Sequence, residues 1–184
     1  MRWDELFGDL EAQLEAAETA EAASEAADRT RREAARLRLL DRLRPAVGHD
    51  LRLQVRGAGQ LSGRLVEVGA QWVLVAEQAG RQALVPLVAV LAVSGLGVQS
   101  VPPDQQDRVF DRLGLGSALR AIARDRLPVT ATLVDGSTLT GTVDRVGADF
   151  LELTEHAVGE PRRRSQVTGT RAVPFEALAV LRST

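Results

Sequence analysis

Two stretches of the chain alternate between apolar and polar residues with the period of a half-buried β-strand. They span residues 51–55 and 129–133, and each is followed by further short alternating runs that glycine-containing turns separate. The apolar positions of the two stretches are Leu51, Leu53, Val55, Val129, Ala131 and Leu133. The pattern therefore predicts two groups of short strands.

The two groups are copies of one unit. Leu61-Ser62-Gly63 in the first copy matches Leu139-Thr140-Gly141 in the second, 78 positions later. Val85-Pro86 matches Val173-Pro174, 88 positions later, so one loop of the second copy has ten extra residues. The matched single positions are Gly69 with Gly147, Trp72 with Phe150, and Glu77 with Glu155.

The turns and glycines indicate how the strands are arranged. Asp135-Gly136 is typical of a two-residue hairpin turn. Gly63 and Gly141 fall at inward-facing positions, where a missing side chain lets a strand bend sharply enough to close a small barrel. We expect a mainly β protein with α-helices, whose five-stranded barrels occupy residues 47–98 and 127–184.

Leu84 to Val93 is a nearly continuous apolar run, and Pro86 within it places it at a sheet edge or a bend. An exposed apolar edge strand tends to pair with other chains. We therefore expect a cover over this run, which is the second barrel, a neighbouring subunit or the chain's own helices.

The N-terminal region, residues 1–46, is rich in Ala, Glu, Leu and Arg and predicts a long helix over about residues 3–44. Its apolar residues recur at alternating steps of four and three, which is typical of a coiled-coil stripe. Four of them are candidate assembly residues: Trp3, Phe7, Leu10 and Leu14.

Charge is segregated along this helix. Residues 1–28 carry nine acidic residues against Arg2 alone, and residues 29–44 carry seven Arg against Glu33 and Asp41. Two such helices could pair antiparallel, acidic half against basic half. The alternative is a solvated helix whose charges only keep it soluble.

A connector, residues 99–126, separates the two barrels. Val101-Pro102-Pro103 interrupts regular secondary structure. Two short helices are expected after it, at Asp104–Leu113 and Ser117–Arg126. Ser117 is the expected N-cap of the second helix.

The second copy resembles the Sm-like family, which includes the Hfq-like bacterial RNA chaperones. The residues that carry the resemblance run from Leu127 to Gly136, through Leu139-Thr140-Gly141 and Phe150 to Leu153, and close at Val173 to Leu178. The first copy resembles a more diverged member. The resemblance implies small five-stranded barrels in rings of six or seven that bind single-stranded RNA rich in uridine or adenine.

The RNA contacts that the resemblance implies are mostly missing. Phe175 and Glu176 stand where Hfq-like proteins have a Lys-His pair. Thr132 and Thr140 stand where they have the aromatic and the Gln of the adenine-binding face. Only Phe150 matches an aromatic on the uridine-binding rim.

Other residues offer contacts of a different kind. Arg162-Arg163-Arg164, with Arg171 nearby, is a basic cluster that binds phosphate in one interpretation and is an ordinary solvated loop in the other. Trp72 and Phe150 are expected to point away from their own barrels. They stack on a base, or they pack against the other repeat, a helix or another chain.

Composition excludes several function classes. The chain has no Cys, and its two histidines, His49 and His156, lack the spacing of a metal site. There is no nucleophile elbow and no Gly-rich phosphate loop, and the net charge is only −2. We expect no enzyme activity, no cofactor, no metal and no small-molecule substrate.

The same evidence bears on location. No apolar segment is long enough to span a bilayer, and acidic residues follow Met1 instead of the apolar core of a signal peptide. All 23 basic residues are Arg, and Lys, Asn and Tyr are missing, which indicates a GC-rich genome. We expect a cytoplasmic bacterial protein that does not bind membranes.

We therefore predict a non-catalytic scaffold that assembles through the barrel edges and the N-terminal helix, as a dimer or a pseudo-ring. Its expected partners are further copies of itself or another protein. The alternative is an RNA-binding regulator that uses the basic 162–171 loop and the outward aromatics.

Overall fold

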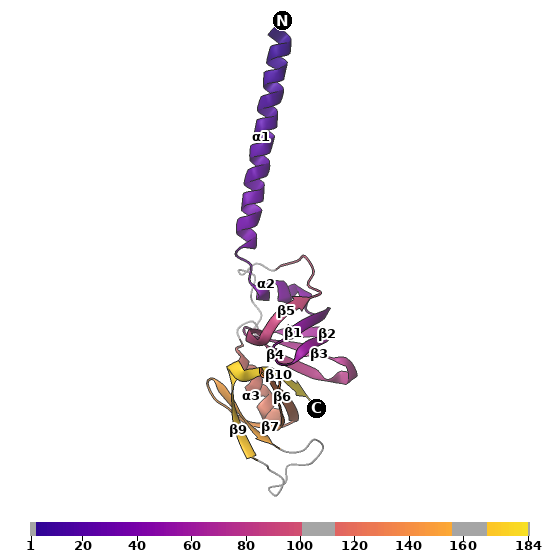
Figure 1. The fold of residues 1–184 in the computed structure, drawn as a ribbon, viewed down its shortest axis with the longest axis vertical. Helices are drawn as coiled ribbons and strands as arrows, with labels where there is room; N and C mark the ends of the chain where they lie inside the picture. The colour runs from indigo at the N-terminus through magenta and orange to yellow at the C-terminus, as the bar shows by residue number, and fades with distance from the viewer. Residues whose placement is uncertain (1–2, 101–112, 156–168, 184) are drawn as a thin grey trace. The chain divides into compact units, whose positions relative to one another are not determined.

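A computed structural model of the chain describes residues 3–100, 113–155 and 169–183 (Figure 1). It divides into two compact units, residues 1–38 and 39–184. The predicted first helix of the connector falls almost wholly outside the described residues. None of the described helices is both long enough and apolar enough to cross a membrane.

The first unit is a single helix, α1 (Trp3–Ala34), of 32 residues. It ends earlier than the expected boundary near Arg44, although neither Gly nor Pro interrupts the sequence there. Its last turn tightens, because the N–H of Arg36 donates to the Glu33 carbonyl at 3.1 Å.

The second unit begins at Leu39, five residues after the end of α1, and its first residues are helical. They form α2 (Leu39–Leu43) and the 3₁₀ turn η1 (Arg44–Ala46), and they bury Leu43 and Ala46 in a core. Burial of these apolar side chains outweighs the local preference to continue one helix. Asp41 is buried beside them and accepts from Arg44 at 3.0 Å.

The ten strands in the described part of the second unit form one antiparallel open sheet, in the order β5-β1-β2-β3-β4-β10-β6-β7-β8-β9. The strands of the first half are β1 (Asp50–Val55), β2 (Gly59–Val68), β3 (Trp72–Ala76), β4 (Gln82–Pro86) and β5 (Val90–Ser94). Those of the second half are β6 (Pro128–Leu133), β7 (Thr138–Val146), β8 (Phe150–Glu155), β9 (Gly169–Pro174) and β10 (Leu178–Ser183).

The two halves have the same topology. The order β5-β1-β2-β3-β4 is repeated as β10-β6-β7-β8-β9, and a 3₁₀ turn links the last two strands of each half, η3 (Leu87–Ala89) and η7 (Phe175–Ala177). Another 3₁₀ turn, η2 (Gln78–Gly80), follows β3. The prediction of a mainly β protein with helices is confirmed. The structure does not show the two closed barrels that the sequence predicts. Instead, the pairing of β4 with β10 joins the two halves into one open sheet.

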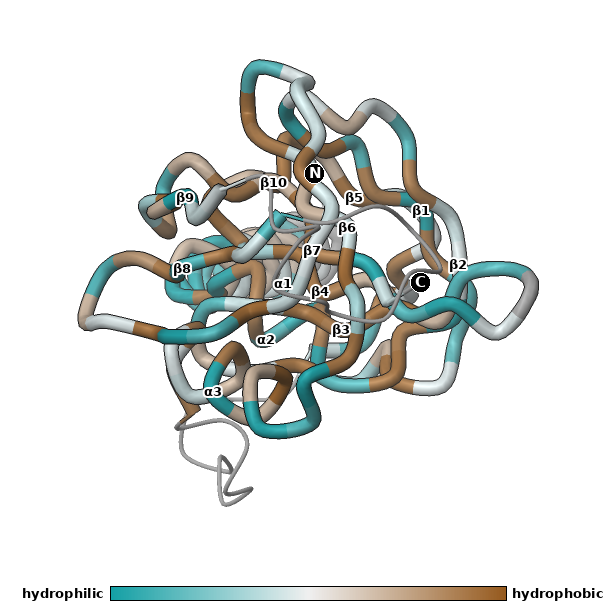
Figure 2. Tube along the Cα trace, turned by 90° about the horizontal axis from the view of Figure 1, so that it is seen from below, coloured by the Kyte–Doolittle hydropathy of each residue, from teal (hydrophilic) through white to brown (hydrophobic). Residues whose placement is uncertain are grey.

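The second unit has two apolar cores, and apolar and polar residues alternate along strands such as β1 (Figure 2). The first core is built on Leu53, Leu61 and Leu65, and the second on Leu151 and Leu153. The helix α3 (Leu115–Asp125) covers the second core with Leu115 and Leu119. The duplicated sequence thus produces two cores of the same design.

Two expected local signals differ in outcome. The Asp135-Gly136 turn is present: Gly136 has a φ of +89° and donates to the Leu133 carbonyl at 2.9 Å. The hydroxyl and the N–H of Ser137 both donate to the Asp135 carboxylate, which lowers the pKa of that carboxyl. The expected N-cap at Ser117 is wrong, because α3 begins at Leu115 with Gly114 as its N-cap and no side-chain capping bond.

The matched glycines Gly63 and Gly141 are required by close approach of a neighbouring strand. A Cβ atom at Gly63 would overlap the carbonyl oxygen of Ala76 on β3, and one at Gly141 would overlap that of Thr154 on β8. Because both obstacles are backbone atoms of paired strands, they cannot move aside as a flexible side chain could.

Replacing either glycine should therefore destabilise the sheet. We expect Gly63→Ala and Gly141→Ala each to lower the free energy of unfolding by about 2–3 kcal/mol, through overpacking. Urea denaturation of each variant measures this. Gly169→Ala in β9 is the matched control, since nothing lies within 4 Å of a Cβ atom there. Unchanged stability of both test variants would contradict this account of the duplicated glycine.

Candidate functional site: the joint and the open edges of the sheet

The candidate site begins with the joint between the two halves, where β4 pairs with β10. Leu181 lies opposite Leu84, and Arg182 opposite Ala83. Successive β4 residues enter different cores: Ala83 and Val85 belong to the first core and Leu84 to the second. Both faces of β4 are therefore buried, and the second repeat covers the first part of the apolar run 84–93.

Strand β10 serves both cores in the same way. Ala179 and Val180 pack in the first core, while Leu178 and Leu181 pack in the second. All four are at most 2% exposed. The joint is thus an apolar interface shared by the two halves.

An ion pair lies at one end of this joint. Arg182 of β10 donates to the Glu77 carboxylate with an Nε–Oε2 distance of 2.9 Å, and its Nη1 lies 3.4 Å from the Thr132 hydroxyl. The Arg182 and Glu77 side chains are only 23% and 13% exposed. Partial burial strengthens such a pair relative to one in open solvent. Sequence spacing gave no sign of it, because 105 positions separate the partners.

Strand β5 forms one open end of the sheet and pairs with β1. The register between these strands shifts at Leu91, whose side chain is 57% exposed. Val88, in the turn before β5, is also exposed. By the repeat, Leu91 corresponds to the fully buried Ala179 of β10. The second part of the apolar run therefore lies at an edge, with exposed side chains.

Strand β9 forms the other open end and pairs with β8. Ala172 and Arg171 are exposed there, and Arg171 forms an ion pair with Glu155. By the repeat, β9 corresponds to β4, as β5 corresponds to β10. The two open edge strands, β9 and β5, are thus the repeat counterparts of β4 and β10, the two strands that pair at the joint.

The structure describes only some of the sequence-predicted nucleic-acid residues. Arg162, Arg163 and Arg164 lie outside the described residues, and Arg171 is paired with a carboxylate. Their role stays a prediction.

The two outward aromatics differ from each other. Trp72 is 5% exposed, packs in the second core and donates from Nε1 to the Leu113 carbonyl at 3.0 Å. Phe150 is half-buried. Each ring covers the glycine three residues before it, Gly69 or Gly147, where a Cβ atom would overlap the ring. The Trp72 ring thus packs against the other repeat, which was one of the two interpretations, and offers little surface to a base.

The assembly stripe lies in the first unit. Phe7, Leu10 and Leu14 are 58%, 57% and 62% exposed on α1, and the Trp3 side chain lies outside the described ones. Exposed apolar residues at this spacing are typical of a surface that packs against another helix or a groove.

The described residues contain no group of three or more metal-ligating side chains close enough to hold an ion. No protein-family model matches the chain, and no curated protein is found similar to it. The candidate site therefore rests on the geometry of the joint and the edges.

The ion pair at the joint can be tested on its own. Glu77→Gln should lower the free energy of unfolding by about 2 kcal/mol, because it leaves a partly buried guanidinium without its charged partner. The matched control is Glu152→Gln, which removes a more exposed pair with Arg145 and should cost less than about 1 kcal/mol. If urea denaturation shows the same decrease in the free energy of unfolding for both variants, the Glu77 pair stabilises the protein no more than the more exposed pair does.

Proposed function

We propose that the protein is a non-catalytic scaffold of Sm-like barrels that assembles head to tail through its two open sheet edges. In this proposal each half of the sheet is a small barrel, and β9 of one copy pairs with β5 of the next. The stripe on α1 is a second self-association surface. Three copies in a ring would contain six halves and leave no edge open.

The observation that carries this proposal is the β4–β10 joint. In it, β4 at one end of the first half pairs with β10 at the facing end of the second half, so that Leu84 lies opposite Leu181. Transferred by the repeat, the same geometry pairs Ala172 of one copy with Val93 of another. An open edge offers unpaired N–H and C=O groups to such a strand.

The edges differ from the joint in strength. Leu84 is replaced by Ala172 and Ala83 by Arg171, so the β9 edge is less apolar than β4. Arg182 corresponds to Ser94, so the ion pair with Glu77 has no counterpart between copies. Contacts between copies should therefore be weaker than the joint within a chain, which suits an assembly that forms and dissociates.

The edges can be blocked one at a time. Leu91→Lys on β5 and Ala172→Lys on β9 each place a charge at an edge, a change that discourages strand pairing. We expect each variant alone to have a lower mass in multi-angle light scattering than the unchanged protein at the same concentration. Val66→Lys, on the internal strand β2, is the control and should leave the mass unchanged, because Val66 is partly exposed and away from both edges.

Mixing the two variants tests whether the pairing is head to tail. The Leu91→Lys variant keeps an intact β9 edge and the Ala172→Lys variant keeps an intact β5 edge. An equimolar mixture should therefore form a species larger than either variant forms alone. A mass that stays the same in the mixture, or an unchanged protein that is monomeric at every concentration, would exclude assembly through these edges.

The helix is tested by deletion. Removing residues 1–38, which form a separate unit, should leave residues 39–184 folded and lower the number of copies in the assembly. Circular dichroism reports folding, and light scattering at matched concentration reports mass. The same number of copies with and without residues 1–38, obtained by dividing the measured mass by the mass of one chain, would restrict assembly to the sheet edges.

A further inference from the structure

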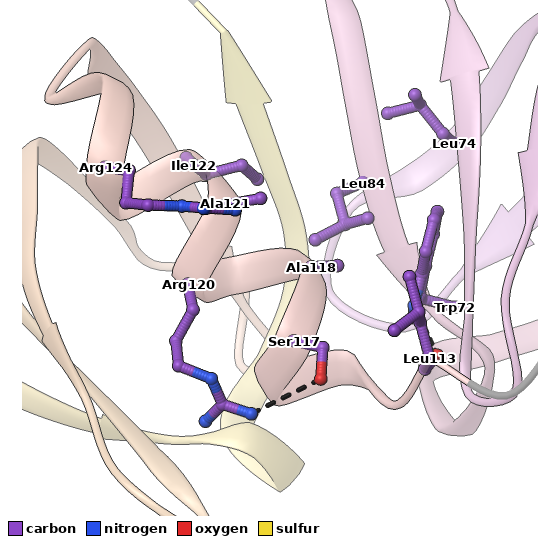
Figure 3. A pocket seen from close by; sticks show the side chains of 10 residues that line it. All are labelled: Trp72, Leu74, Leu84, Leu113, Ser117, Ala118, Arg120, Ala121, Ile122 and Arg124. Carbon is purple, nitrogen blue, oxygen red and sulfur yellow. Dashed lines mark hydrogen bonds between the residues drawn. The ribbon is translucent and has the colours of Figure 1, made fainter. Parts of the chain in front are cut away.

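A groove of about 760 Å³ lies beside α3, on the side of the second unit where β3 and β4 meet that helix. Its floor is apolar: Trp72 and Leu84 are 5% and 3% exposed, and Leu74 lies next to them. Figure 3 shows these three side chains opposite the residues of α3. The sheet-edge assembly proposed above uses neither this groove nor its residues.

The α3 side of the groove is lined largely by small side chains. Ser117, Ala118 and Ala121 line it, and such small side chains let another helix approach closely. Arg120 and Arg124, one turn apart, are exposed at the same wall. Within the part of the chain that the structure describes, neither guanidinium is in an ion pair. Arg120 donates to the Ser117 hydroxyl at 3.3 Å. The groove therefore combines an apolar floor with two exposed cations.

The first half of α1 has the complementary pattern. The exposed side chains of Phe7, Leu10 and Leu14 form its apolar stripe. With 100° between successive residues, three acids lie along one side of that stripe. They are Glu11, Glu15 and Glu18, and all are exposed. The spacing of Glu11 and Glu15 equals that of Arg120 and Arg124.

We propose that this groove binds the acidic first half of α1 from a second copy of the chain. The stripe packs on the floor formed by Trp72 and Leu84, and the line of glutamates faces Arg120 and Arg124. This inference rests on the proposed function, because it names the surface that receives the α1 stripe during assembly. It replaces antiparallel pairing of two α1 helices as the role of that stripe.

Crosslinking between single-cysteine variants tests the contact directly, because the chain has no cysteine of its own. Leu10→Cys and Ala121→Cys are made in separate full-length chains, mixed and treated with a short bismaleimide. We expect a covalent dimer that contains one chain of each kind. Ser137→Cys, in the hairpin turn of the second half, replaces Ala121→Cys in the control mixture and should give at least about tenfold less dimer, as expected for a position that is not in the interface.

A charge exchange tests the recognition. Arg120→Glu with Arg124→Glu should reduce the crosslinked dimer about tenfold, through repulsion of Glu11 and Glu15. Glu11→Arg with Glu15→Arg in the partner chain should restore it. Arg29→Glu with Arg32→Glu, in the basic half of α1, is the matched control and should leave the yield unchanged.

The outcomes separate this inference from the proposed function. Light scattering that shows assembly through the edges, together with no Leu10–Ala121 crosslink, would overturn the groove inference alone. Loss of the crosslink only with the Arg29 and Arg32 variants would assign the stripe to antiparallel α1 pairing, and so overturn it too. A chain carrying both cysteines that crosslinks only within itself would exclude the second copy as occupant.

Discussion

The pairing of β4 with β10 is the contact on which the rest of the second unit depends. Each half has only about 50 residues, and a core of that size is marginal alone, because a small domain buries too little of its surface. At this joint the two halves share strands: Leu84 contributes to the second core and Val180 to the first. Separating the halves would expose both cores at once, so they should unfold together.

The joint also shows how the two copies have diverged. Ala179 at the joint is fully buried, whereas its counterpart Leu91 is exposed at the β5 edge. Arg182 at the joint has Ser94 as its counterpart. The inner strands thus carry the features of a permanent interface, buried apolar side chains and a shielded ion pair, and the outer strands lack the ion pair. An obligate interface is more apolar than a transient one, and β9, which has Ala172 and Arg171 where β4 has Leu84 and Ala83, is less apolar than its counterpart at the joint.

Local sequence signals predicted the parts of this fold that depend on backbone geometry. Asp135-Gly136 forms the expected turn, and the matched Gly63 and Gly141 occupy positions where no side chain fits. Contacts between distant segments could not be predicted in this way. The end of α1 depends on burial of Leu43 in a core made mostly by later strands, and Arg182 finds Glu77 across 105 positions. The sequence repeat predicted equivalent halves, but not the strand that joins them.

The edges and the groove differ in their physical chemistry, and in the proposed assembly this difference would give them separate roles. Strand pairing at an edge is dominated by backbone hydrogen bonds, which are uncharged and specify direction but little sequence. The groove couples an apolar floor around Trp72 to exposed charges at Arg120 and Arg124, and interactions of such charges weaken as salt screens them. Assembly through the edges should therefore persist at ionic strengths that release α1 from the groove. In such a scaffold the sheet would stay continuous from copy to copy, while the contacts of α1 with the groove would form at low ionic strength and dissociate at high ionic strength.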